Sequence, residues 1–182
     1  MKKGSYSNNL IELPFSKIFF RLAVPNLFST IIASATTIFD LWYVGQIGIP
    51  ELAGVAYIFP IYMLASMLSN GAFGGAVSGA TARAFGSKNI FKAECIFRSA
   101  ILIALFGALL MMILFFCLAE TFFTYLSIDQ KITTSALTYG RILLGGISLI
   151  WLFNIVIAIT RGSGNTLIPA ISWLIVLIFH IL

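Results

Sequence analysis

The residue best placed to do chemistry is Asp40, a single carboxylate near the end of a long apolar stretch. No Lys or Arg lies between Arg21 and Arg83. A carboxylate inside a membrane segment costs about 2.5–3.5 kcal/mol on insertion scales, so it needs a polar cavity or a partner. A cavity for a cation is one interpretation. The other is a solvated helix end in the headgroup region, because Gly45 follows within about one to two turns.

Polar and small residues precede Asp40 at helical spacing. At about 100° per residue they fall within roughly 80° of one another on one face of a helix. This face consists of Asn26, Ser29, Ala33, Thr37 and Asp40. Pro25, at the start of the face, frees a backbone carbonyl and can bend the helix. The spacing therefore predicts a polar cavity wall that ends at Asp40.

Three further polar side chains lie in later apolar segments. Asn154 is deep in its segment, so we expect it to form a hydrogen bond with another helix. Tyr139 fits either a polar site or the aromatic belt at the membrane interface. For His180, a lone imidazole, an interhelical hydrogen bond and a proton relay both stay open.

Gly71, Gly75 and Gly79 form two consecutive GxxxG steps. Small ridges of this kind let helix backbones approach closely in lipid. The pattern predicts a helix-packing surface, with a sliding or bending surface as the alternative.

The composition places these residues in an all-α polytopic membrane protein. Hydrophobic residues make up 60% of the chain and charged residues 9%, whereas soluble domains carry about 25% charged residues. Only helices satisfy their own backbone in lipid without closing into a barrel, and no alternating pattern of barrel strands is present. No basic stripe suits nucleic acid. The chain has one His, and its two Cys would lie roughly 33 Å apart on one helix, so we expect no metal or redox site.

About five transmembrane helices are expected after a cytoplasmic segment over residues 1–14. Their ranges are about 15–44, 53–80, 93–118, 132–160 and 167–182. Of the 11 Lys and Arg, nine fall on the side of the N-terminus and two on the other, so the positive-inside rule makes the N-terminus cytoplasmic. The last segment is short and still apolar at its end. We expect a chain truncated within its fifth helix, with a short tilted helix as the alternative.

The sequence offers nothing that assembles an enzyme. It has no HExxH motif and no paired carboxylates, and the glycine-rich stretch over residues 160–166 lacks the spacing of a phosphate-binding loop. We therefore expect neither an enzyme nor a cofactor.

Four stretches, in chain order, resemble the multidrug and toxin extrusion (MATE) family of secondary transporters. They are LAVPNLFSTIIASATTIFDLWYVGQIGIPELAGVA, ARAFGSKN, YGRILL and RGSGNT. The resemblance covers about residues 21–169. It implies a fold of about twelve helices in two six-helix bundles that face a central cleft. This chain would carry an incomplete first bundle, an N-lobe over residues 15–182.

The resemblance also implies roles for particular residues. Asp40 matches the family's acidic residue in the first helix and would hold the coupling ion, H⁺ or a transient Na⁺. Pro25 matches the kink proline of that helix. Tyr139 lies where some members place a Tyr in a hydrogen-bond network with the Asp, and His180 falls near a position where many members have Asn. The expected members of the cavity or network are Asn26, Ser29, Thr37, Tyr139, Asn154 and His180.

The implied activity is export of organic cations or amphipathic drugs in exchange for H⁺ or Na⁺, across a bacterial plasma (inner) membrane. The implied partners are a small cationic or amphipathic substrate, the lipid bilayer, and a missing C-terminal half or a second subunit. Two other interpretations stay open. One is a lipid-linked oligosaccharide flippase of the same superfamily, and the other is a non-transporting membrane fragment.

Overall fold

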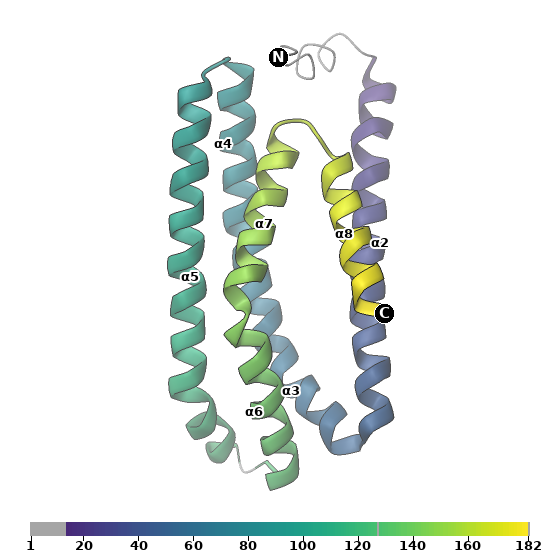
Figure 1. The fold of residues 1–182 in the computed structure, drawn as a ribbon, viewed down its shortest axis with the longest axis vertical. Helices are drawn as coiled ribbons and strands as arrows, with labels where there is room; N and C mark the ends of the chain where they lie inside the picture. The colour runs from purple at the N-terminus through teal and green to yellow at the C-terminus, as the bar shows by residue number, and fades with distance from the viewer. Residues whose placement is uncertain (1–13, 127, 182) are drawn as a thin grey trace.

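The computed structural model describes residues 14–126 and 128–181, and this part of the chain is all-helical (Figure 1). The predicted all-α membrane fold is therefore confirmed. Of the expected cytoplasmic segment 1–14, only Pro14 belongs to the described part. Lys2 and Lys3 at the start of the chain, and Leu182 at its end, lie outside the described residues.

The helices follow one another with short connections. They are α2 (Phe15–Ile47), α3 (Ile49–Ser66), the π-helical segment η1 (Met67–Phe73), α4 (Gly74–Gly86), α5 (Ile90–Tyr125), α6 (Gln130–Gly145), α7 (Ile147–Gly162) and α8 (Leu167–Ile181). The segments α3, η1 and α4 follow one another without a break and form one helical segment. The helices α6 and α7, in contrast, meet at an angle of 45°.

Three of the described helical segments are long and apolar enough to cross a membrane: Phe19–Ile47, Ile49–Gly86 and Ile90–Tyr125. The bent pair α6–α7 makes a fourth if it counts as one span. The fifth apolar segment, α8, has 15 residues, fewer than the about 20 of a typical span. Long apolar helices of this kind define an integral membrane protein.

The helices pack through small residues. A Cβ on Gly54 of α3 would lie 2.7 Å from the backbone nitrogen of Ala136 in α6, and one on Gly162 of α7 would lie 2.5 Å from the carbonyl oxygen of Ser78 in α4. In lipid, association depends on such close packing because burial of apolar surface gives no advantage. The buried core lies between these helices and includes Phe115, Leu144 and other apolar residues of α3–α7.

The described helices make no close contact at Gly71, Gly75 or Gly79, so the predicted packing role of these residues stays a prediction. A Cβ on Gly71 or Gly75 would meet no atom within 4 Å, and one on Gly79 would meet only the side chain of Arg83. The reason is the direction of the glycine face. The opposite face of α4, through Val77 and other residues, is the one buried against its neighbours.

Helix α2 continues through Pro25 without interruption (Figure 1). Proline lacks an N–H, so the carbonyl of Arg21, four residues earlier, has no donor within the helix. The Thr166 hydroxyl, in the turn between α7 and α8, donates to this carbonyl at 3.4 Å. The freed carbonyl thus ties the start of α8 to α2, and Figure 1 shows the two helices side by side.

Candidate functional site

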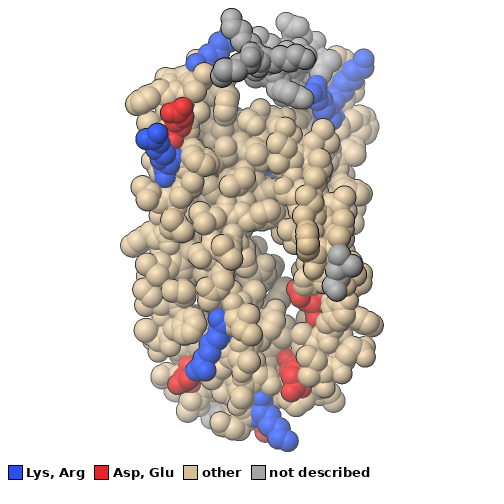
Figure 2. Space-filling model, viewed as in Figure 1, with Lys and Arg blue, Asp and Glu red and all other residues tan. Residues whose placement is uncertain are grey.

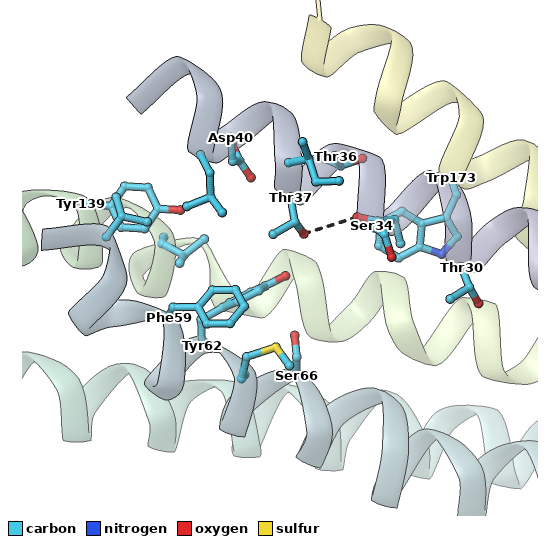
Figure 3. Close-up of a pocket in the computed structure, with 16 residues that line it drawn as sticks. Thr30, Ser34, Thr36, Thr37, Asp40, Phe59, Tyr62, Ser66, Tyr139 and Trp173 are labelled. Atoms are coloured by element: carbon cyan, nitrogen blue, oxygen red, sulfur yellow. Dashed lines mark hydrogen bonds between the residues drawn. The ribbon is translucent and has the colours of Figure 1, made fainter. Parts of the chain in front are cut away.

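A cavity of about 500 Å³ lies between α2, α3, α6 and α8 (Figure 3). In Figure 2, which has the viewpoint of Figure 1, the surface is hollowed beside α2 and α8. Small-molecule sites in proteins have volumes of about 300–1,000 Å³. The volume therefore suits a drug-sized molecule.

Asp40 is the sole Asp, Glu, Lys or Arg among the residues that line this cavity. The other polar lining groups are hydroxyls, from Thr30, Ser34, Thr36, Thr37, Tyr62, Ser66 and Tyr139. The hydroxyls of Thr36 and Thr37 donate to Ile32 O at 3.1 Å and Ala33 O at 3.3 Å, within their own helix. Because a hydroxyl keeps its lone pairs when it donates, these oxygens still face the cavity as acceptors. The cavity is therefore acidic and rich in acceptors.

Aromatic rings form the other part of the lining. Phe59 and Tyr62 come from α3 and Trp173 from α8 (Figure 3). Trp173 is held edge-on against Phe153 of α7, with ring centroids 5.4 Å apart. Ring faces attract cations, by about 0.5–2 kcal/mol each. Together with one carboxylate, they suit an organic cation.

Asp40 has one close polar neighbour from a distant part of the sequence. Its Oδ1 lies 3.1 Å from Nε2 of His180 in α8, and both side chains are partly exposed. Within one turn of Asp40, the Tyr43 hydroxyl donates to the carbonyl of Ile181 at 3.4 Å. These two contacts hold the last turn of α8 on α2.

The structure brings together four of the residues expected from the sequence. Asp40, Thr37 and Tyr139 line the cavity, and His180 contacts Asp40. The cavity interpretation of Asp40 thus agrees with its position. His180 lies on another helix beside Asp40, but its Nε2 forms no hydrogen bond among the described residues, so the expected interhelical hydrogen bond stays a prediction.

Three expected members do not line the cavity. Asn26 lies one turn before its first lining residue, Thr30. Ser29 is buried, and its hydroxyl donates to Pro25 O at 2.8 Å. Asn154 donates through Nδ2 to Ser69 Oγ in η1 at 3.0 Å, as expected for an interhelical bond, but away from Asp40. The spacing of these residues predicts which face of α2 they share. It does not predict over which length of α2 the neighbouring helices stand apart and leave a cavity.

Tyr62, Ser66 and Trp173 also line the cavity, although they were not among the residues expected there. Nothing in the pattern of α3 or α8 distinguishes these side chains from ordinary membrane residues. Only the position of α8 beside α2 and of α3 across the cavity brings them together.

Residues 25–182 match the family model described as MatE. The chain belongs to the MatE family. The resemblance to MATE transporters is therefore confirmed, and membership of a transporter family agrees with the expectation that the chain is not an enzyme. One curated relative is an FAD transporter of Shewanella oneidensis, 25% identical over 96 residues, which are 53% of this chain and 21% of the relative.

Solved MATE structures share the fold of this MatE chain. A crystal structure of MATE in complex with MaD5 superposes on this chain with a TM-score of 0.86. The superposition covers 94% of this chain and 39% of the MATE chain. An outward-facing multidrug resistance MATE family transporter gives a TM-score of 0.85 and the corresponding shares 94% and 38%. Both are 23% identical to this chain. The chain thus has the fold of a part of a MATE transporter and spans 38–39% of their length.

Proposed function

We propose that this chain is the N-lobe, over residues 15–182, of a cation-coupled antiporter that exports amphipathic organic cations. One observation carries the proposal: Asp40 is the single charged side chain on a cavity otherwise lined by hydroxyls, aromatic rings and aliphatic groups. An ionisable residue at membrane depth is costly, and it commonly marks a substrate or ion pathway.

The exchange follows from competition for one carboxylate. An organic cation is held by the ionised carboxylate and the ring faces. A coupling cation that binds at Asp40, H⁺ or Na⁺, removes the negative charge and weakens the hold on the substrate. By linkage, the substrate weakens coupling-ion binding by the same factor. Two ligands that exclude each other at one group are the minimum that an antiporter needs.

The distribution of charge supports a cytoplasmic N-terminus, and we propose a bacterial inner membrane as the location. The start of α2, the α4–α5 turn and the α7–α8 turn lie at one end of the molecule (Figure 1). That end carries Lys17, Arg21, Arg83, Lys88, Lys92, Arg98 and Arg161. Lys131 and Arg141 belong to α6, toward the other end. Lys and Arg mark the cytoplasmic side of a membrane protein.

The lining argues against substrates that carry phosphate, such as a lipid-linked oligosaccharide or the FAD named for one relative. Proteins recognise phosphates mainly with Arg, Lys or backbone N–H groups. No Lys or Arg lines the cavity. Its single charge is negative, so it repels a phosphate and attracts a cation.

Binding of tetraphenylphosphonium to the purified chain in lipid nanodiscs tests this proposal, because binding can be measured without transport. The Asp40→Asn variant is expected to bind about tenfold more weakly, a loss of about 1.4 kcal/mol. The matched control is Glu94→Gln in α5, which removes an exposed carboxylate outside the cavity. Equal affinity of wild type and Asp40→Asn would refute the proposal. Absence of binding in all three proteins would favour a non-transporting membrane fragment.

A further inference from the structure

A groove of about 330 Å³ between α4 and α5 shares no residue with the cavity at Asp40. We propose that this groove binds a phospholipid with an anionic headgroup, with the phosphate beside Lys92 and one acyl chain along α5. The inference goes beyond the proposed function and does not rest on it, because no residue assigned to transport lines the groove.

One face of each helix forms the walls of the groove. The lining residues of α5 follow the spacing i, i+3, i+4, i+7, i+8 and i+11, which places them on one side of the helix. They are Lys92, Cys95, Ile96, Ser99, Ala100 and Ile103. Across the groove, α4 presents Ala76, Val77 and Ala80. Because alanine and serine side chains are short, they leave a channel between two helices that lie side by side (Figure 1).

The groove opens to the outside of the molecule and has the depth of one membrane leaflet. Cys95 and Ser99 are exposed, and Ile103 is 52% exposed. From Lys92 to Ile103 the groove follows about three turns of α5, or about 16 Å. One leaflet contributes about 15 Å of hydrocarbon, half of a core of about 30 Å. The groove therefore has the length that an acyl chain occupies in its own leaflet.

The charge of the groove is positive at its polar end. Lys92 is the sole Asp, Glu, Lys or Arg on the lining. It lies in the first turn of α5, where the Asn89 side chain accepts a hydrogen bond from its backbone N–H at 2.9 Å. Residues 83–98 carry four positive charges less one negative charge, from Glu94, a net charge of +3. The four basic residues form no salt bridge within residues 14–126 and 128–181. They are Arg83, Lys88, Lys92 and Arg98. Basic pockets between membrane helices at this level bind anionic lipid headgroups.

One cation above apolar walls selects the occupant. An anionic phospholipid places its phosphate beside Lys92 and covers the apolar walls with an acyl chain. Phosphatidylcholine offers the same chain, but its own ammonium group cancels the charge of its phosphate. A free phosphate leaves the walls uncovered, and Lys92 repels an organic cation. The groove and the cavity at Asp40 thus favour ligands of opposite charge.

The two cysteines of the chain allow a test on the wild-type protein. Cys95 lines the groove, whereas Cys117 lies on the same helix outside it, and both are exposed. The purified full chain in detergent is titrated with phosphatidylglycerol or with phosphatidylcholine. Mass spectrometry then gives the rate at which N-ethylmaleimide modifies each cysteine.

We expect phosphatidylglycerol to protect Cys95 half-maximally at a concentration about fivefold lower than phosphatidylcholine does, the effect of one basic residue near the membrane surface. Cys117 should react at the same rate with both lipids. Equal protection by the two lipids, or no protection of Cys95, would overturn the proposal. Protection by inorganic phosphate alone would show a phosphate site instead of a lipid site. Protection without lipid that increases with protein concentration would place a second copy of the chain in the groove, and would also overturn the proposal.

A matched pair of variants separates a lipid site from general attraction by a basic surface. Lys92→Gln removes the charge that lines the groove, and Arg98→Gln removes an exposed charge of the same helix outside the lining. Lys92→Gln is expected to lose the fivefold preference for phosphatidylglycerol, whereas Arg98→Gln keeps it. Equal loss in the two variants would show that net charge alone attracts the lipid, and would refute the inference.

Discussion

The close contact of α3 with α6 makes Gly54→Ala a sharp test of the packing that shapes the cavity. A Cβ at this position would lie 2.7 Å from the backbone nitrogen of Ala136, and ordinary van der Waals contact begins at 3.4 Å. The obstacle is backbone, which cannot rotate away, so the two helices must separate by about 0.7 Å. Overpacking of this kind costs about 1–3 kcal/mol.

The matched control is Gly75→Ala, where a Cβ would meet no atom within 4 Å. Both substitutions gain the same helix propensity, up to about 1 kcal/mol, so this gain cancels in the comparison. Equilibrium unfolding in mixed micelles with increasing SDS, followed by circular dichroism, gives the two free energies of unfolding. We expect Gly54→Ala to be less stable than Gly75→Ala by about 1–3 kcal/mol.

The same substitution should weaken cation binding. Val55 follows Gly54 and lines the cavity, as does Tyr139, which lies one helical turn after Ala136. Separation of α3 from α6 therefore widens the cavity at the Asp40 end. Equal stability and equal tetraphenylphosphonium affinity in the two variants would refute the assigned packing of α3 on α6.

Three further predictions concern single contacts. A double-mutant cycle of Asn154→Leu and Ser69→Ala should give a coupling energy of about 0.6 kcal/mol, and no more than about 1.7 kcal/mol, in micelle unfolding, which are the average and the maximum for hydrogen bonds between membrane helices. A value of zero would show that the two side chains form no stabilising hydrogen bond. Trp173→Leu should lower the affinity for tetraphenylphosphonium about two- to thirtyfold, which corresponds to the loss of one cation–π contact. Unchanged affinity would show that Trp173 does not contact the bound cation. Arg141→Gln should cost less than about 1 kcal/mol of stability because its ion pair with Glu120 is exposed, and a larger loss that high salt does not remove would contradict this assignment.

The helical fold could be predicted because lipid imposes strong constraints on sequence. Apolar stretches such as the one before Asp40 have to form helices, and short polar connections separate them. Asp40 and Thr37 could be assigned to one polar face from their spacing alone. The ends of the helices, such as Ile47 and Tyr125, lie beyond the strictly apolar residues because polar ends extend into the interface.

The partners across the cavity could not be predicted, since they depend on which helices meet. His180 reaches Asp40 only because α8 packs along α2. The GxxxG steps at Gly71 and Gly75 identified a small face on the helix, but not the direction in which this face points. Asn154 was correctly expected to bond another helix, and its partner Ser69 is 85 positions away.

The measurement that tests the central claim most directly is chemical labelling of Asp40 by a hydrophobic carbodiimide, followed by mass spectrometry of the chain in nanodiscs. If Asp40 binds the organic cation, tetraphenylphosphonium should protect its carboxyl group from modification in a dose-dependent way. Labelling of Glu94, outside the cavity, should be unaffected. Modification of Asp40 at the same rate with and without the cation would contradict the account.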